Sequence, residues 1–355
     1  MSYSIFKEFY LNGFAALLVS ICLAFILYRT KKIHKSITSD NQCGPQKIHN
    51  EDIIRIGGLS IFLSLLINSF FVSDVINNNL FFLIIASTPA FLGGFIEDIT
   101  KKINPFYRLL TSFISGIFFV IIFKISISHT NIYLLDFFLK NQIFSILFTI
   151  FCIVMLTQSM NIIDGLNGLS MGCALIICVS ILFICIEVQD YLLILITSII
   201  IGAIAGCLVF NFPKPYFFLG DGGAYLIGSL LAFLVVLLSE RNNLVSPFYC
   251  LLLVLYPVYE TTRSFCRRLL IAQNMTFRPD HKHLHSLLFK FVLKQKINKC
   301  ANSFSSLLIL IFQSLYAVIG FNFFSNKYYL ILFIFLFIII YELIYIYLKG
   351  SFQKT

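Results

Sequence analysis

Charged residues are scarce in this sequence. Only 12% of its 355 residues are charged, while 59% are hydrophobic. A soluble domain carries about twice that share of charge and cannot bury so much apolar sequence in one core. The scarcity excludes the soluble globular class and predicts a protein that crosses a membrane many times.

The sequence also has no small-residue cleavage site after its first apolar run, near Tyr10 to Tyr28. Basic residues follow this run at once, so we expect a retained helix rather than a removed signal peptide. The ten cysteines lie mostly inside apolar runs and at no metal-ligand spacing. This pattern favours core packing over disulfides or a zinc site.

Eleven apolar runs are long enough to cross a bilayer, if a span needs about 17 to 25 residues. The segment from Asn131 to Leu139 is too short and carries Asp136, so we expect a connection there. The sequence predicts an all-α membrane helix bundle, with residues 1–355 as a single domain. The runs begin near Tyr10, Ile56, Leu80, Tyr107, Gln142, Leu169, Tyr191, Gly223, Leu244, Phe304 and Tyr328.

Basic residues set the expected orientation. The formal net charge of +10 would suggest nucleic acid for a soluble domain, but most lysines and arginines fall in alternate loops of this chain. Loops rich in lysine and arginine stay in the cytoplasm. We therefore expect no nucleic-acid partner, an outside N-terminus, an inside C-terminus, and cytoplasmic loops at 29–55, 97–106, 161–168, 211–222 and 261–303.

Polar turns interrupt the apolar runs on this cytoplasmic side. They are Glu97-Asp98, the stretch from Asn161 to Gly168, and Asp221 between glycines. Ionisable groups at the mouth of a membrane helix are costly and read as functional. Their hard oxygen atoms suit Mg²⁺ or Mn²⁺.

Each turn also has an ordinary interpretation. The acidic pair is followed by Lys101 and Lys102, which is equally typical of a solvated salt-bridge patch. The glycines around Asp221 are typical of a turn, although they would also let a phosphate approach the start of a helix. Gly57-Gly58 favours close helix packing.

Three histidines alternate in the last polar turn, at His281, His283 and His285. Strand-like spacing would put all three on one face, where they could bind a metal or hydrogen-bond an anionic ligand. The basic residues of the same loop are typical of any loop beside anionic lipid.

Taken in order, these turns resemble the polyprenyl-phosphate N-acetylhexosamine-1-phosphate transferases, the superfamily of the WecA and MraY enzymes (glycosyltransferase family 4). The resemblance runs from about Asp40 to Ser286. The matching segments are Asp40, Gln46-Lys47, His49 and Ile54-Arg55 with Gly57-Gly58; Gly94 to Asp98 with Arg108-Leu109-Leu110; Asn161 to Leu169; Phe218 to Gly223; and Pro279 to His285.

Two departures stand out. Glu97 replaces the first aspartate of the family's acidic pair, and Ser286 replaces the last histidine. The histidine turn resembles the WecA-like branch more than the MraY branch.

The resemblance implies transfer of an N-acetylhexosamine-1-phosphate from a UDP-sugar to undecaprenyl phosphate, with release of UMP. This reaction would initiate a lipid-linked cell-envelope glycan at the cytoplasmic face of a bacterial inner membrane. Mg²⁺, or Mn²⁺ in its place, would be the cofactor, membrane lipid would surround the protein, and a homodimer is a candidate assembly. The sugar is not specified.

The resemblance also assigns roles to residues. Asp221 and Asn161 would hold the metal, and Asp98 with Glu97 would orient the lipid phosphate and take its remaining proton. Asp164 and Asn167 would contact the nucleotide sugar. The phosphates would be held by Lys47, Arg55, Arg278, His283 and His285. The alternative hypotheses are a lipid transporter or flippase and a non-catalytic relative that binds lipid phosphate.

Overall fold

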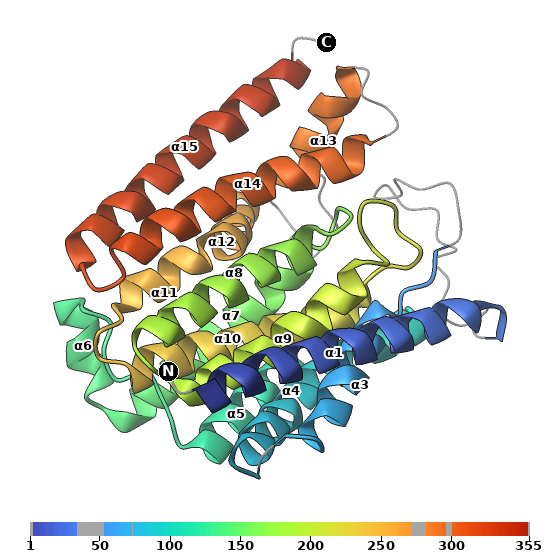
Figure 1. The fold of residues 1–355 in the computed structure, drawn as a ribbon. Coiled ribbons are helices and arrows are strands. Elements are labelled where there is room, and N and C mark those ends of the chain that lie inside the picture. The colour runs from blue at the N-terminus through green and yellow to red at the C-terminus, as the bar shows by residue number, and fades with distance from the viewer. Residues whose placement is uncertain (1–2, 34–52, 73, 272–281, 296–299, 354–355) are drawn as a thin grey trace.

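The computed structural model describes residues 3–33, 53–72, 74–271, 282–295 and 300–353, and these residues form an all-helical bundle (Figure 1). The one β pairing in these ranges is an isolated parallel bridge between Arg55 and Phe218. The helices are α1 (Tyr3–Arg29), α3 (Gly57–Ser69), α4 (Asp74–Thr100), α5 (Pro105–Phe123), α6 (Tyr133–Leu139), α7 (Gln142–Ile163), α8 (Leu169–Glu187), α9 (Tyr191–Leu208), α10 (Gly220–Arg241), α11 (Pro247–Leu253), α12 (Leu255–Ile271), α13 (Leu284–Lys294), α14 (Ala301–Asn322) and α15 (Lys327–Gln353).

Capping side chains fix several helix starts. The Asn104 carboxamide oxygen accepts from the Phe106 N–H at 3.0 Å, and a proline opens α5. Asn141 caps α7 in the same way. Such residues satisfy N–H groups that have no partner inside the helix.

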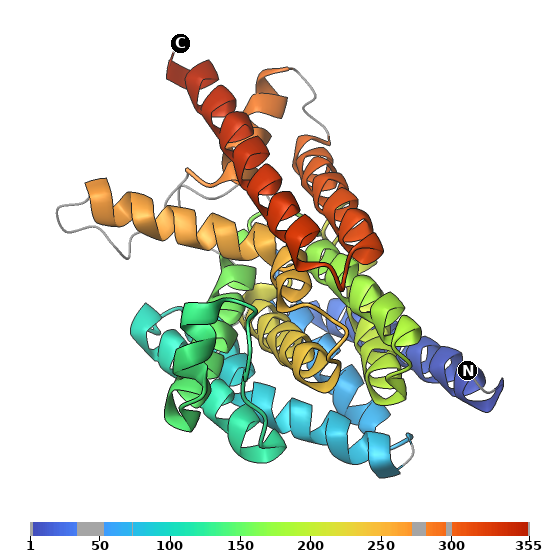
Figure 2. The ribbon, with the colours of Figure 1, turned by 90° about the vertical axis from the view of Figure 1, so that its left-hand side faces the viewer.

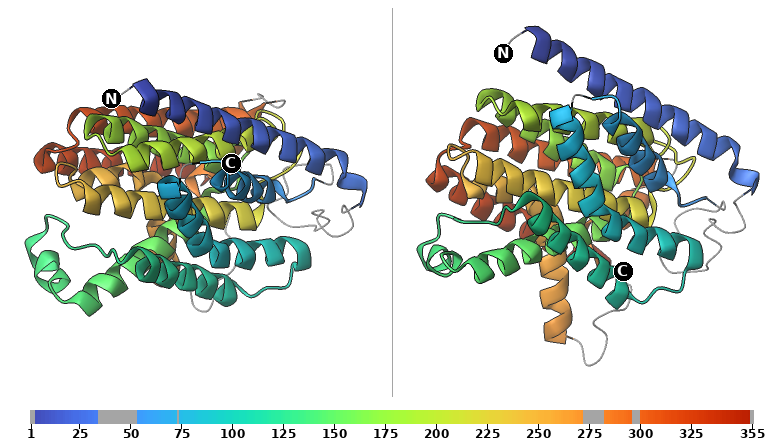
Figure 3. Two further views of the ribbon diagram at one scale, coloured as in Figure 1. Left: turned by 60° about the horizontal axis from the view of Figure 1, so that its bottom comes forward. Right: turned by 90° about the horizontal axis from the view of Figure 1, so that it is seen from below.

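Helix α10 forms the centre of the bundle. Nearly every residue of this helix is buried, because α4 and α7 pack against it most extensively and α3, α8 and α5 cover further faces. A helix that is apolar on all sides needs such surroundings. Figure 2 shows α10 enclosed, whereas α12 projects away from the bundle, as it also does in Figure 3.

Nine helices of the described ranges are long and apolar enough to span a membrane, fewer than the eleven expected. The run near Ile56 forms α3, which has 13 residues. At about 1.5 Å per residue this helix is shorter than the roughly 30 Å hydrocarbon layer.

The run near Leu244 was also expected to be one span, but it divides into α11 and α12 at Val254. Pro257 gives the physical reason. Its ring has no N–H and would clash with the carbonyl four residues earlier, at Leu253, where α11 ends. The segment from Asn131 to Leu139 is a connection as expected, since its helix, α6, has seven residues.

Glycines let three helices meet at the start of α10. A Cβ on Gly94 of α4 would lie 2.5 Å from backbone atoms of Asp221 and Gly222. A Cβ on Gly58 would lie 2.3 Å from the backbone of Gly223. The missing side chains therefore allow α3 and α4 to contact the first turn of α10 directly.

Gly94→Ala should destabilise the fold, because the added methyl meets backbone that cannot move cheaply. We expect a loss of about 1 to 3 kcal/mol, as for other overpacked sites. The thermal unfolding midpoint of the full chain in detergent measures it. Gly350→Ala is the control, because nothing lies within 4 Å of its added Cβ. Equal midpoints for the two variants would contradict the proposed close contact.

Candidate active site

The segment that carries Arg55 is paired with the segment that leads into α10. The Phe218 N–H donates to the Ile54 carbonyl at 2.8 Å, and the Gly58 N–H donates to the Leu219 carbonyl at 2.8 Å. This short pairing holds Arg55 beside the first turn of α10. The burial of Ile54 and Phe217 keeps the pairing away from water.

Asp98, at the end of α4, caps α10. Its two carboxylate oxygens accept from the N–H groups of Asp221 and Gly222, each at 2.9 Å, and only 3% of Asp98 is exposed. Gly220 adopts a φ of +81°, and a Cβ there would lie 2.6 Å from the Asp98 carboxylate. Only glycine fits this position, because both the space and the left-handed backbone exclude a side chain.

Asp221 lies in the first turn of α10 and pairs with Arg108 of α5. The Arg108 guanidinium donates to the Asp221 carboxylate, while its Nε–H is buried without a hydrogen-bond partner among the described residues. A buried guanidinium donor without a partner is costly and is poised for an anionic ligand. The Glu97 carboxylate accepts from the Ile103 N–H at 2.6 Å, across the turn after α4.

Asn161, in the last turn of α7, lies close to α10. Its carboxamide oxygen accepts from the Tyr225 hydroxyl at 3.3 Å, and Tyr225 follows Asp221 by about one helical turn. The same hydroxyl lies 3.4 Å from the Gln158 carboxamide oxygen. Asn161 and Asp221 therefore border one small region between α7 and α10.

Asp164 directly follows α7 and is half-buried. Burial and, to a smaller extent, the Asp221 carboxylate raise the pKa of its carboxyl, Arg55 opposes the rise, and the resulting pKa is about 7. These interactions join the turn after α7 to the group around the start of α10. At neutral pH this carboxyl is close to half protonated.

Asn167 lies deeper in the same turn. Its backbone N–H donates to the Asn302 carboxamide at 2.7 Å, its side-chain amide donates to the Pro213 carbonyl at 3.4 Å, and 5% of the residue is exposed. The neighbouring Gly168 N–H donates to Asn211 at 2.6 Å. These bonds tie the turn to α14 and to the loop before α10.

The turn that carries His283 and His285 contacts the Asp164–Gly165 turn through the ring of His285. The ring of His285 lies so close to Gly165 that a Cβ there would be 2.6 Å from Nε2. The ring of His283 stacks on it, with centroids 5.3 Å apart. Burial and, to a smaller extent, the neighbouring His283 lower the pKa of His285, Glu260 opposes this, and the resulting pKa is about 4. His285 is therefore neutral at physiological pH and can offer a hydrogen bond but no charge.

The structure thus gathers most of the predicted residues near the start of α10. Arg55, Glu97, Asp98, Asn161, Asp164 and Asp221 surround it, His283 and His285 approach from the side, and Asn167 is largely buried. Lys47 and Arg278 lie outside the described residues. The roles of all these residues stay predictions.

Three residues that contact predicted site residues were not themselves predicted to be site residues. Arg108 was quoted as part of a motif but not as a site residue, although its place after the acidic turn was a usable signal. Glu260 was a carboxylate in a largely apolar run, which is itself a functional signal. Tyr225 had no signal in the sequence, because a tyrosine in an apolar helix is ordinary.

The donor set fits magnesium rather than zinc. The described residues contain no group of three or more histidine, cysteine or acidic side chains that could hold a metal ion. Asp221 and Asn161 offer one carboxylate and one carboxamide. Mg²⁺ takes one or two carboxylates and completes its shell with water and substrate phosphate, so these two residues fit it when a phosphate ligand is present.

Asp164→Asn should change how stability depends on pH. The folded pKa is raised, so the folded state binds the proton more tightly, and wild-type stability falls as pH rises through about 7. Asparagine has no carboxyl group to ionise, so the variant does not show this fall in stability with pH. We expect the variant to gain stability relative to wild type from about pH 5 to about pH 7, with no further gain above about pH 8, measured as unfolding midpoints without added metal. A difference between the two proteins that does not change with pH would contradict the assignment.

Comparison with known proteins identifies related sequences. Residues 80–239 match the family model described as Glycosyl transferase family 4. The chain is 30% identical over 302 residues to the undecaprenyl-phosphate alpha-N-acetylglucosaminyl 1-phosphate transferase of Thermotoga maritima, covering 83% of each chain.

Two further relatives are more distant in coverage or identity. A probable undecaprenyl-phosphate N-acetylglucosaminyl 1-phosphate transferase of Bacillus subtilis is 25% identical, over 80% of this chain and 79% of its own. A phospho-N-acetylmuramoyl-pentapeptide-transferase of Staphylococcus saprophyticus is 29% identical, over 66% of this chain and 78% of its own. The match to the Thermotoga relative, at 30% identity over 83% of each chain, together with the family model, shows that the chain belongs to glycosyl transferase family 4.

Proposed function

We propose that this membrane protein transfers an N-acetylhexosamine-1-phosphate from a UDP-sugar to undecaprenyl phosphate and releases UMP. The observation that carries the proposal is the first turn of α10, where Asp221 lies against Arg108 and Asp98 caps the helix. The names of the Thermotoga and Bacillus relatives support the same reaction.

The chemical step joins two anions. An oxygen of the lipid phosphate forms a bond to the phosphorus that carries the sugar, the diphosphate P–O bond breaks, and UMP takes the electron pair. A phosphate monoester is largely dianionic at neutral pH, since its second pKa is near 6. A strong base is therefore a minor need, and the main task of the site is to offset repulsion between phosphates.

Two arginines are suited to that task. Arg108 has a buried Nε–H available for a phosphate, and Arg55 lies beside the acidic group. Arginine binds phosphate through planar, directed donors. In our proposal Arg108 holds the diphosphate, while Arg55 balances Asp98 and Asp164.

In this proposal the two acidic residues, Asp98 and Glu97, have different roles. The Asp98 carboxylate is committed to two backbone N–H groups, so it acts by positioning the first turn of α10. Glu97 is less buried, and we assign to it the contact with the lipid phosphate. The glutamate side chain is one methylene longer than that of aspartate. This length fits the hydrogen bond that its carboxylate also accepts from the Ile103 N–H.

Asp221 and Asn161 are the residues that we propose hold Mg²⁺, with Mn²⁺ as a substitute. When bound, the ion would neutralise charge on the diphosphate as the bond to UMP breaks. Asp164, at the turn after α7, is assigned to the nucleotide sugar, together with the neutral ring of His285.

The site would face the cytoplasm of a bacterial cell, where nucleotide sugars are made. We propose that α3 and the α11–α12 pair also cross the membrane, which would restore eleven crossings, an outside N-terminus and an inside C-terminus. Figure 1 draws the start of α1 and the end of α15 toward opposite ends of the long helices, which supports termini on opposite sides of the membrane. UDP-N-acetylglucosamine is the first sugar donor to test, because the Thermotoga relative is named for that sugar.

Asp221→Asn should lower UMP release by about 100-fold or more, because an amide binds a divalent cation and Arg108 far more weakly than a carboxylate does. The assay measures UMP release by the purified full chain with Mg²⁺, undecaprenyl phosphate and a panel of UDP-sugars. Mass spectrometry identifies the lipid product by its mass.

Glu187→Gln is the matched control, since this exposed carboxylate lies at the far end of α8. Near-normal turnover by Asp221→Asn would overturn the metal assignment. If wild type releases no UMP with any sugar, the transferase proposal fails and the transporter and non-catalytic hypotheses gain support.

A further inference from the structure

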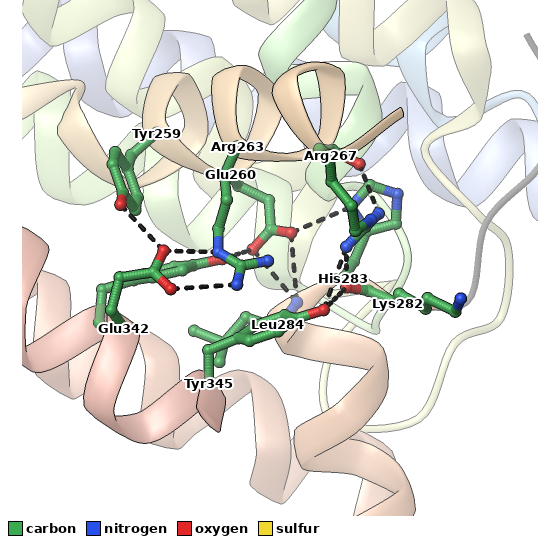
Figure 4. Close-up of polar contacts among 11 residues, drawn as sticks. Tyr259, Glu260, Arg263, Arg267, Lys282, His283, Leu284, Glu342 and Tyr345 are labelled. Atoms are coloured by element: carbon green, nitrogen blue, oxygen red, sulfur yellow. Dashed lines mark hydrogen bonds and ion pairs between the residues drawn. The ribbon is translucent and has the colours of Figure 1, made fainter. Parts of the chain in front are cut away.

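Glu260 of α12 is a buried carboxylate that the reaction chemistry does not use. Only 2% of Glu260 is exposed. It accepts from the His283 Nδ1 at 3.0 Å, from the Leu284 N–H at 3.2 Å and from the Tyr341 hydroxyl at 2.5 Å (Figure 4). A buried charge persists only when such partners satisfy it.

These bonds determine the proton position on one histidine. Tyrosine hydroxyl and backbone N–H are donors here, and an ionised carboxylate only accepts, so the His283 Nδ1 must carry the hydrogen. The second ring nitrogen of His283, Nε2, is therefore left to other partners. A carboxylate that orients a functional histidine through Nδ1 is a recurrent arrangement in enzymes.

The contacts continue from Glu260 to the site. His283 stacks on His285 with the two rings 4° from parallel, and His285 lies against Gly165. Gly165 adjoins Asp164, which interacts electrostatically with Asp221. A shift of Glu260 would thus move two rings beside the turn assigned to the nucleotide sugar.

The other end of this chain of contacts is the C-terminal helix. Tyr341 of α15 donates to Glu260. Tyr345, one turn later, donates to the Lys282 carbonyl at 3.0 Å and accepts from Arg267 at 3.1 Å. Figure 4 shows the bonds of Tyr345 that join α15 to Lys282 and to Arg267 of α12. All of these residues lie outside the matched range 80–239.

We propose that Glu260, held by Tyr341, is a positioning residue that fixes the His283–His285 pair against the Asp164–Gly165 turn for binding of the nucleotide diphosphate. The proposal rests on the transferase function above. It makes α15 a support of the active site rather than a membrane anchor alone. Glu260 itself touches no reacting atom.

A double-mutant cycle tests whether Glu260 acts through His283. Glu260→Gln keeps the shape but loses the charge, so we expect the KM for the UDP-sugar to rise about tenfold, with kcat within about threefold. In a His283→Ala background the same change should alter KM less than about twofold, since residues that act as a unit are not additive. The measurements use the purified full chain with Mg²⁺ and undecaprenyl phosphate.

A role in packing alone predicts a different result. An equal rise in KM in both backgrounds would overturn the proposal, as would a fall in kcat with unchanged KM. If Glu260→Gln does not fold, Tyr341→Phe carries the cycle, because it removes one donor and leaves the carboxylate in place.

Tyr259→Phe is the matched control. Its hydroxyl donates to Glu342 at 2.9 Å in the same network but makes no bond to Glu260, so its KM should stay unchanged. If wild type shows no turnover, the dissociation constant of UDP, measured by calorimetry, replaces KM in the same cycle. Failure of the transferase proposal is then distinguishable from failure of this one.

Discussion

The structure depends on the bond between the Asp98 carboxylate and the first N–H groups of α10. These N–H groups have no partner inside their helix, and a carboxylate at a helix start also meets the positive end of the helix dipole. Burying the charge is costly, and two backbone bonds at 2.9 Å offset part of that cost. The bond joins the end of α4 to the start of the most buried helix and thereby fixes the direction of Asp221.

Much of this arrangement could be predicted from the sequence, because polar residues and glycines at the ends of apolar runs are rare and costly. The turns after α7 and before α10 lie where they were expected. The number of membrane spans was not predictable from apolar length alone. Pro257 divides one apolar run, and the other, α3, ends after 13 residues.

Contacts between distant parts of the chain could not be read from the sequence. Arg108 and Asp221 are 113 residues apart, and Tyr341 and Glu260 are 81 apart. No local pattern encodes such pairs, since they follow from how α5, α10, α12 and α15 pack. Asp98 shows the same limit: the acidic pair was predicted as one unit, yet one carboxylate caps a helix while the other bonds across a turn.

The site therefore consists of two groups of residues. The first group, around α10, carries the acids and two arginines and lies within the family match except for Arg55, while the second group, from α12 to α15, supports the histidines. The central claim is that substrate phosphate and metal meet at the start of α10. A structure of the full chain with Mn²⁺ and UDP tests it most directly, through the anomalous signal of manganese. The account predicts the ion within about 2.2 Å of an Asp221 oxygen; an ion elsewhere, with UDP bound away from Arg108, would contradict it.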